Sequence, residues 1–198
     1  MANIFIACNN DPGTVLHNFM QSCADEARQI CVDNNHSYTY VGVPELTEAN
    51  VIPPMADHKI CFIAAHGDED GVYNENDADV VTTRTTNYNF ANKGFYSISC
   101  LCAQNLCPNL MRIGLSLFVG YSAPFYVGEQ EDAFLDCAIE GLKQLLNGQS
   151  KDVAYKIMLN KYDKVIDTLP FKDKILLLHN KESLVFAGDG GISLSDLM

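Results

Sequence analysis

The sequence has few basic residues and no long apolar run, and these absences exclude several classes of protein. Its 198 residues include 13 Lys and Arg against 25 Asp and Glu, which gives a net charge of −12. Surfaces that bind nucleic acid need clustered Lys and Arg to displace phosphate counterions, and anionic lipid attracts basic segments. We therefore expect neither nucleic acid nor membrane as a partner. No apolar run approaches the roughly 18 residues of a transmembrane helix.

The beginning of the sequence also lacks the features of a secretory signal peptide. Met1 leads directly into the apolar residues Ile4, Phe5 and Ile6, with no basic region and no small-residue cleavage site. A chain of this length can bury a sufficient core without disulfides, so its eight cysteines do not require an oxidising compartment. We therefore expect a reducing, cytoplasmic location.

The usual motifs of cofactor and metal sites are missing. The first apolar run is followed by NNDPG (9–13) instead of the Gly-rich GxGxxG of a dinucleotide site. Cys100, Cys102 and Cys107 lack the two-residue gaps of zinc ribbons and fingers. The acidic stretch 68–79 lacks the EF-hand pattern of calcium loops. We expect no cofactor and no bound metal.

The apolar pattern that is present predicts strands alternating with helices. Short apolar or β-branched runs predict buried strands, and spacings of three and four residues predict amphipathic helices. The expected strands cover 3–8, 37–43, 59–65, 80–85, 95–100 and 115–121, and the expected helices cover 15–31, 106–113, 131–148 and 150–169. The runs 175–178 and 184–187 predict a hairpin, 44–54 is expected to be a connection with room for one helical turn, and 68–79 is expected to be a loop. This alternation favours an α/β fold with a mostly parallel sheet and helices on both faces, in one domain over 1–198.

Two of the expected strands end in residues that can perform chemistry. The run 59–65 is followed by His66 and Gly67, and the run 95–100 ends in Cys100. The functional crevice of a parallel sheet lies at the carboxyl ends of its strands, so neighbouring strands would bring the imidazole and the thiol together. His66 can then serve as general base and acid, and Cys100 as nucleophile. The backbone N–H groups of Gly67 and Cys100 can form an oxyanion hole.

These stretches, CFIAAHGDEDGVY (61–73) and FYSISCLCAQNL (95–106), resemble the caspase-like fold of clan CD cysteine peptidases. The run 115–124 resembles the strand that flanks the substrate cleft in this family, and 131–158 is similar to the helix pair that follows it in CHAT-like and clostripain-like members. The resemblance covers roughly the whole chain. It implies a caspase-like three-layer α/β sandwich that cleaves peptide bonds through a thioester intermediate.

By position, the resemblance implies that His66 is the base, that Cys100 is the nucleophile and that Gly67 and Cys100 supply the oxyanion hole. The sequence departs from the family after the nucleophile, where many members have Gly or Ser but this chain has Leu-Cys. It also has Ile98 at the position two before the nucleophile, which is often polar in the family. Cys102 therefore stays open as a rival nucleophile.

Further residues are expected to bind a protein or peptide substrate. Asp68 lies in the acidic stretch directly after His66, and the acidic charge favours a basic P1 residue, the residue whose carbonyl is attacked. Ser122 and Tyr126 follow the run 115–121 and can line the P1 pocket. A regulatory protein partner is left open.

Two alternatives to the peptidase remain. One is a catalytically inactive caspase-like domain that serves as a binding or scaffold module. The other is a flavodoxin-like domain that binds a small molecule near 9–13, with His66 and Cys100 far apart. Peptide turnover separates the first alternative from the peptidase, and the spatial arrangement of the two residues separates the second.

Overall fold

The computed structural model describes residues 1–86 and 88–197, so the expected domain boundary at residue 198 lies outside the described residues. The strands of the main sheet are β1 (Asn3–Cys8), β2 (Ser37–Val41), β3 (Ile60–Ala64), β7 (Gly94–Ile98), β8 (Leu117–Tyr121) and β9 (Leu184–Gly188). A small second sheet comprises β4 (His66–Gly67), β5 (Gly71–Tyr73) and β6 (Asp79–Thr82). The helices are α1 (His17–Asp33), α2 (Glu48–Asp57), α3 (Leu106–Arg112), α4 (Glu131–Leu146), α5 (Lys151–Ile166) and α6 (Phe171–Ser183).

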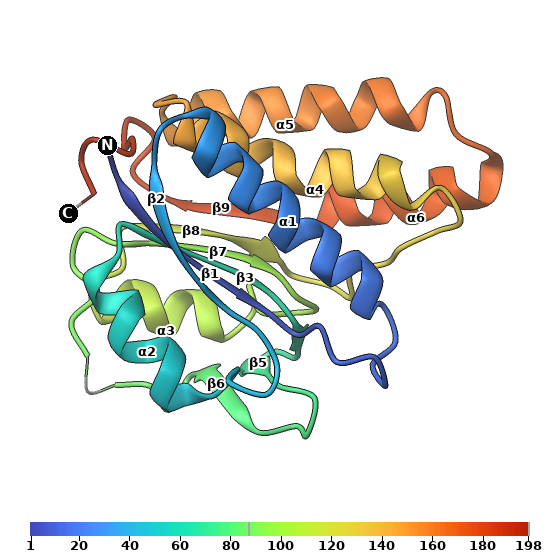
Figure 1. The fold of residues 1–198 in the computed structure, drawn as a ribbon. Helices are drawn as coiled ribbons and strands as arrows, with labels where there is room; N and C mark the ends of the chain where they lie inside the picture. Colours follow the sequence, from blue (N-terminus) through green and yellow to red (C-terminus); the bar gives the residue numbers. More distant parts are fainter. Residues whose placement is uncertain (87, 198) are drawn as a thin grey trace.

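The main sheet lies between two layers of helices (Figure 1). Its six strands follow the order β2-β1-β3-β7-β8-β9, and every neighbouring pair is parallel except β8 with β9. Helices α1, α4 and α5 cover one face, and α2 and α3 cover the other. The predicted α/β sandwich with a mostly parallel sheet is therefore confirmed.

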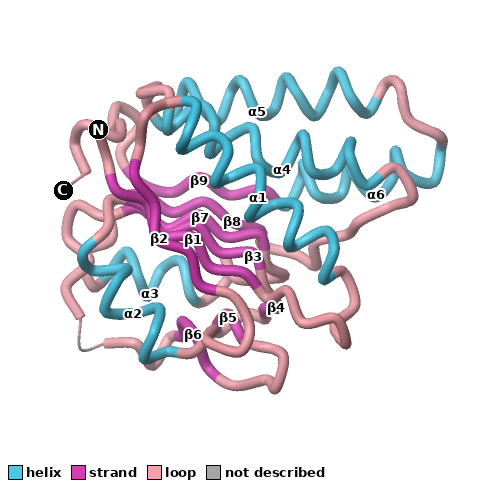
Figure 2. Tube along the Cα trace, in the orientation of Figure 1, coloured by secondary structure: helices cyan, strands magenta, loops and turns pink. Residues whose placement is uncertain are grey.

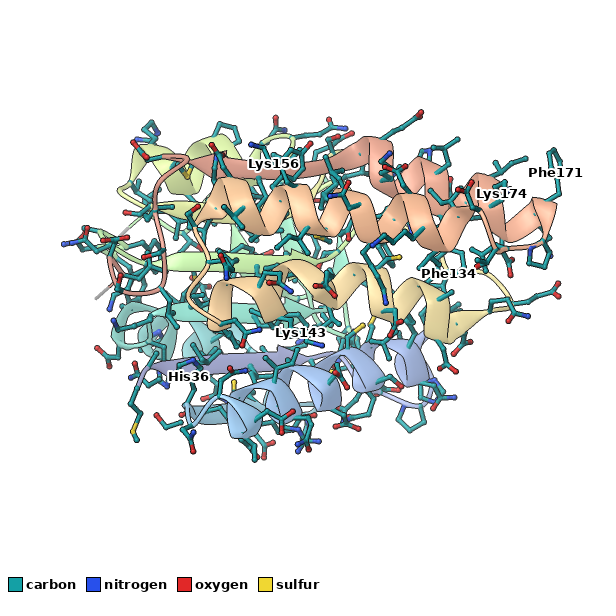
Figure 3. The ribbon with its side chains drawn as sticks, turned by 90° about the horizontal axis from the view of Figure 1, so that it is seen from above. His36, Phe134, Lys143, Lys156, Phe171 and Lys174 are labelled. Atoms are coloured by element: carbon teal, nitrogen blue, oxygen red, sulfur yellow. The ribbon has the colours of Figure 1, made fainter. Side chains whose placement is uncertain are left out.

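Alternation along the strands divides the apolar core in two. In β1, Ile4, Ile6 and Cys8 face the core beneath α1 and α4, whereas Phe5 and Ala7 face the core beneath α2 and α3. Successive side chains of a strand point to opposite faces, so a central strand buried on both sides reads as one continuous apolar run. On the first face, α1, α4 and α5 lie side by side over the sheet (Figure 3).

Two expected connections contain regular structure. The segment 44–54 holds most of α2, although Pro53 and Pro54 lie inside the helix. Val51, Ile52 and Met55 are buried from this helix. Burying them offsets the hydrogen bonds that the prolines cannot donate.

The acidic stretch 68–79 is also not a plain loop. It contains β5, which pairs antiparallel with both β4 and β6. Val72 is fully buried in this small sheet and anchors it to the core beneath α2 and α3. A single buried side chain between polar residues gives too short a pattern to predict a strand.

The hairpin expected near the C-terminal end is a helix followed by a strand. Residues 175–178 belong to α6, and 184–187 belong to β9, which lies antiparallel to β8. Of the run that suggested a strand, Ile175 and Leu178 are exposed and Leu177 is buried, and the polar Asp173 and Asn180 are buried with it. Because the buried face of α6 is mostly polar, the hydrophobic pattern does not predict a helix.

Candidate active site

The strands that carry the two candidate residues are direct neighbours in the sheet. Strand β3 pairs with β7 in parallel register, with Ala64 opposite Ile98. The Ala65 N–H donates to the Ile98 carbonyl at 3.4 Å, so the pairing continues to the carboxyl ends. His66 follows in β4, at the same end of the sheet (Figure 2). The flavodoxin-like alternative, which required a wide separation of His66 and Cys100, is not supported.

The segment around Gly67 packs directly against the backbone of Cys100. A β-carbon added at Gly67 would lie 2.8 Å from the Cys100 carbonyl oxygen and 2.8 Å from the Ser99 β-carbon. Contacts this short are not found for real β-carbons, so only glycine allows this approach. The sequence His66-Gly67 thus holds the imidazole-bearing segment against the thiol-bearing loop.

His66 and Cys100 line the same small cavity, of about 40 Å³. The remaining lining residues are mostly apolar: Leu16, Phe19, Met20, Ala65, Ile98, Ser99 and Phe125. They come from the start of α1, from the ends of β3 and β7 and from the segment after β8. The cavity therefore lies at the carboxyl end of the sheet, where the crevice was expected.

The thiol of Cys100 is held by the segment that follows β8. The Phe125 N–H donates to the Cys100 Sγ at 3.3 Å, and the thiol lies 3.9 Å from the Phe125 carbonyl oxygen. The Leu101 N–H donates to the Ala123 carbonyl at 3.1 Å, which aligns the two loops. Among the eight cysteines, all of them within the described ranges, Cys100 alone is not buried.

Cys102 occupies a different environment, although it lies only two residues along the chain. Leu101 between them has a φ of 58°, in the left-handed region, so the chain reverses there. The Cys102 side chain then enters the core beneath α2 and α3, where a β-carbon at Gly120 would lie 2.9 Å from its sulfur. Burial raises the pKa of the Cys102 thiol to about 11. At neutral pH this thiol is protonated and inaccessible.

Two backbone N–H groups near the thiol have no assigned acceptor. In the described part of the chain, no acceptor is found for the Cys100 N–H. The Asp68 N–H donates to the Gly71 carbonyl at 3.0 Å, which makes that pair hydrogen-bonded. Because hydrogen-bonded and non-hydrogen-bonded pairs alternate between antiparallel strands, the next pair, Gly67 with Val72, is non-hydrogen-bonded. The Gly67 N–H therefore points away from β5.

Asp68 organises the turn between β4 and β5. Its Oδ1 accepts hydrogen bonds from the Asp70 N–H at 2.8 Å, the Gly71 N–H at 3.0 Å and the Tyr73 hydroxyl at 3.0 Å. The residue is exposed and is not among those lining the small cavity. In this structure Asp68 supports the histidine-bearing segment, and its role in substrate binding stays a prediction.

Ser122 and Tyr126 lie in the segment after β8, and both form hydrogen bonds with residues of α6. The Ser122 hydroxyl donates to the Ser183 carbonyl at 3.1 Å. The Tyr126 N–H donates to the Asn180 side chain at 2.9 Å, and the Asn180 amide donates back to the Tyr126 carbonyl at 2.7 Å. Both residues are described by the structure and neither lines the small cavity. Of this segment, Phe125 is the residue that faces it.

Sequence reasoning missed the residues that position this segment. Asn180 clamps the Tyr126 backbone, and Asp173 accepts from the Glu129 N–H at 3.2 Å and the Gln130 N–H at 3.0 Å. Both side chains are buried. Both residues have charged or polar neighbours in the sequence, which therefore carries no signal of their burial.

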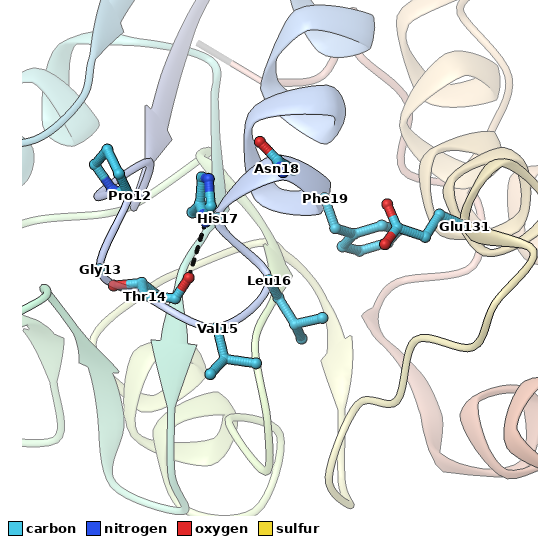
Figure 4. Close-up of a pocket in the computed structure, with 9 residues that line it drawn as sticks. All are labelled: Pro12, Gly13, Thr14, Val15, Leu16, His17, Asn18, Phe19 and Glu131. Atoms are coloured by element: carbon cyan, nitrogen blue, oxygen red, sulfur yellow. Dashed lines mark hydrogen bonds between the residues drawn. The ribbon is translucent and has the colours of Figure 1, made fainter.

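A wider hollow of about 330 Å³ adjoins the small cavity and shares Leu16 and Phe19 with it. It lies between the loop before α1 and the start of α4, where Glu131 faces Phe19 (Figure 4). The His17 Nδ1 lies 3.0 Å from the Thr14 carbonyl oxygen and braces this loop. Leu16 and Phe19 thus separate an apolar cavity beside the thiol from a more open hollow with a carboxylate at its edge.

Metal and membrane sites were searched over residues 1–86 and 88–197. In that part of the chain, no group of three or more His, Cys, Asp or Glu side chains is placed to hold a metal ion. No helix there combines the length and the apolar character needed to span a bilayer.

Comparison with solved structures identifies the fold. The chain has the caspase-like fold of clan CD cysteine peptidases, as its sequence motifs predicted. It is similar to a structure described as a complex of the Porphyromonas gingivalis RgpB pro- and mature domains, with a TM-score of 0.67 and 11% identity over 99% of this chain. It is also similar to the Arg-specific cysteine proteinase gingipain R (RgpB), with a TM-score of 0.69 and 10% identity over 98% of this chain.

These likenesses concern three-dimensional structure rather than sequence. The chain spans about half the length of the solved chains, 49% of one and 48% of the other. No family model matches the sequence, and no curated protein matches it.

Proposed function

We propose that this protein is a cysteine peptidase that hydrolyses peptide bonds with a dyad of Cys100 and His66. The observation that carries the proposal is that these two residues line one cavity at the carboxyl end of the sheet. A histidine or a cysteine at the end of a strand is, on its own, commonly structural. The presence of both in one crevice of this fold favours catalysis. The neighbour that is described as the Arg-specific cysteine proteinase gingipain R supports the same reaction class.

The proposed reaction has two half-reactions. His66 accepts the proton of the Cys100 thiol, and the thiolate sulfur attacks the substrate carbonyl carbon. The peptide C–N bond then breaks, the amine leaves with the proton from His66, and a thioester remains on Cys100. Water next attacks the thioester, giving one proton to His66, and the C–S bond breaks. Cys100 regains the proton as the carboxylic acid product leaves.

The N–H groups of Gly67 and Cys100 are proposed to stabilise the oxyanion of each tetrahedral intermediate. Donors aimed at a developing negative charge lower the barrier because they are already oriented before the reaction. Two features support this role: the Cys100 N–H has no acceptor among the described residues, and the Gly67 N–H points away from β5. The close packing of Gly67 on Cys100 keeps the two donors near one another.

The proposal extends to the domain organisation, the location, the partner and the substrate. A single domain and a cytoplasmic location stay predictions from the sequence. A protein partner is proposed because one neighbour is described as a complex of pro- and mature domains. A basic P1 residue is favoured by the net charge of −12 and by the described Arg specificity of gingipain R.

Cleavage of a mixed peptide library tests the proposal. The wild-type protein should cut the library, Cys100→Ala should lose at least about a thousandfold in rate, and Cys102→Ala should retain cleavage. Cys102→Ala is the matched control, because it removes a sulfur two residues away that is buried on the opposite face. Cleavage retained in Cys100→Ala would show that Cys100 is not the nucleophile. No cleavage by the folded wild type would favour the inactive binding module instead.

A further inference from the structure

The wall of the cavity beside Cys100 bears on which substrates the proposed peptidase accepts. Apart from His66, Ser99 and Cys100, its lining is apolar: Leu16, Phe19, Met20, Ala65, Ile98 and Phe125. No carboxylate of the described residues lines it. An arginine or lysine side chain entering this space would lose its hydration without meeting an opposite charge, which is strongly unfavourable.

The size of the cavity restricts the substrate further. A water-sized group needs about 10–15 Å³ of such space. A cavity of about 40 Å³ therefore accommodates roughly three such groups, which matches an isopropyl side chain. This limited room favours short aliphatic side chains over aromatic and long basic ones.

Leu16 closes the outer side of this cavity. It lies directly before α1 with a φ of 70°, in the left-handed region that leucine rarely adopts. Its partly buried side chain packs against the same core as Phe19 and Met20. The neighbouring Val15 is 79% exposed and lines only the wider hollow. The chain therefore adopts a disfavoured conformation that directs Leu16, and not Val15, against the small cavity.

Among the described residues that line the small cavity or the wider hollow, Glu131 is the one with a carboxylate. Glu131 lines that hollow together with Leu16 and Phe19, and it is itself exposed. The side chains of Leu16 and Phe19 separate it from the thiol. Among the described residues, a basic P1 side chain placed beside Cys100 would find no carboxylate in the cavity.

We propose that the cavity formed by Leu16, Phe19, Met20, Ile98 and Phe125 is the P1 pocket and that it selects small aliphatic residues, valine and alanine, over basic ones. This inference rests on the proposed function, since it assigns the substrate class of the same site. It departs from the basic preference that the net charge and gingipain R favour. Overall charge acts at long range, whereas the P1 residue is selected by the groups it contacts after desolvation.

Peptidyl acyloxymethyl ketones that differ only in P1 (Gly, Ala, Val, Leu, Phe, Lys or Arg) test the assignment. The Cys100 thiolate displaces the carboxylate leaving group of such a probe and forms a stable thioether, so labelling reports recognition without requiring turnover. The labelling rate at Cys100 is measured by mass spectrometry. We expect the Val and Ala probes to react at least about tenfold faster than the Lys and Arg probes, since pocket fit commonly discriminates by that factor or more.

Two variants of Leu16 sharpen the test. Leu16→Ala enlarges the cavity and should raise labelling by the Leu and Phe probes relative to Val. Leu16→Phe fills it and should lower labelling by Val relative to Gly. Val15→Ala is the matched control on the same loop and should leave the ranking of the probes unchanged. Circular dichroism and thermal unfolding establish that each variant is folded.

The outcomes separate this inference from the proposed function. Labelling of Cys100 by Lys or Arg probes as fast as by Val would overturn the small aliphatic pocket and leave the dyad standing. The same holds if neither Leu16 variant changes the ranking. If no probe labels Cys100 faster than a ketone lacking the peptide, the peptidase proposal fails, and the pocket assignment fails with it.

Discussion

Cys100 and Cys102 are separated by one residue, yet the structure places them in two regions with different chemistry. Cys100 lies partly exposed in a crevice with His66, on the face covered by α1 and α4. Cys102 is fully buried on the face covered by α2 and α3. The reversal at Leu101 produces this difference. Proximity in sequence at the end of a strand therefore does not make two cysteines equivalent nucleophiles.

The comparison extends to the groups around each thiol. The Cys100 sulfur accepts a hydrogen bond from the Phe125 N–H at 3.3 Å, and an imidazole lines the same cavity. The Cys102 sulfur lies 3.6 Å from the Ser99 carbonyl oxygen, an acceptor that favours the protonated thiol. A nucleophilic site requires an accessible thiol and a nearby base, and only the first region supplies both.

The largest expected effect comes from removing the imidazole from the Cys100 region. His66→Ala should lower the rate of peptide cleavage by about a hundredfold to ten-thousandfold, since a general acid and base is lost. Steady-state kinetics with the peptide selected from the library measures the effect. The control is His58→Ala, at the C-terminal end of α2 and two residues before β3, at the amino ends of the strands. Equal loss in both variants would indicate destabilisation and remove His66 from the mechanism.

Alkylation by iodoacetamide measures the difference between the two regions directly. At pH 8, Cys102 should react at least about a hundredfold more slowly than Cys100, because a thiol with a pKa of about 11 is about one-thousandth ionised and this one is also buried. Mass spectrometry of digested protein assigns the modified residue over time. In urea the two thiols should react at similar rates. Equal rates in the native protein would contradict the assigned environments.

The raised pKa of Cys102 also links stability to pH. Burial raises this pKa from 9.0 to about 11, so the unfolded chain ionises first as the pH rises. Its contribution to the free energy of unfolding is present below pH 9 and is lost as the pH rises through 11, by about 2–3 kcal/mol. Urea unfolding of wild type and Cys102→Ala, compared at pH 8 and pH 11, isolates this contribution. A stability difference between the two proteins that is the same at both pH values would refute it.

The smallest effect concerns the segment that holds the Cys100 thiol. Asn180→Ala removes both hydrogen bonds to the Tyr126 backbone and should lower the free energy of unfolding by about 1–3 kcal/mol. It should also slow the alkylation of Cys100 relative to the wild type. The reason is that a displaced Phe125 no longer donates its N–H to the Cys100 Sγ. Asn18→Ala, at an exposed position of α1, should change stability by less than about 0.5 kcal/mol. Unchanged stability in Asn180→Ala would show that its two hydrogen bonds to the Tyr126 backbone do not stabilise the segment after β8.

The sequence predicted most of the fold because its core strands are short apolar runs with clear ends. The run ICFIA of β3 and the run LFVGY of β8 lie in a sheet buried on both faces. Both are almost continuously apolar, which is typical of such strands. Helix α6 was not predicted, because its buried face carries Asp173 and Asn180 while Phe171 is 78% exposed and extends outward (Figure 3). Its stability depends on hydrogen bonds to a distant segment, which local pattern does not encode.

For the candidate site, the sequence by itself determined which chemical groups end the central strands: an imidazole and a glycine after β3, and a thiol after β7. It also indicated that parallel strands would bring them to one edge. Only the tertiary structure decided that β3 and β7 are neighbours, that Leu101 sends Cys102 into the opposite core, and that Leu16 and Phe125 close the cavity. The physical reason is that strand ends follow from local apolar runs, whereas pocket walls come from segments far apart in the chain that meet only on folding.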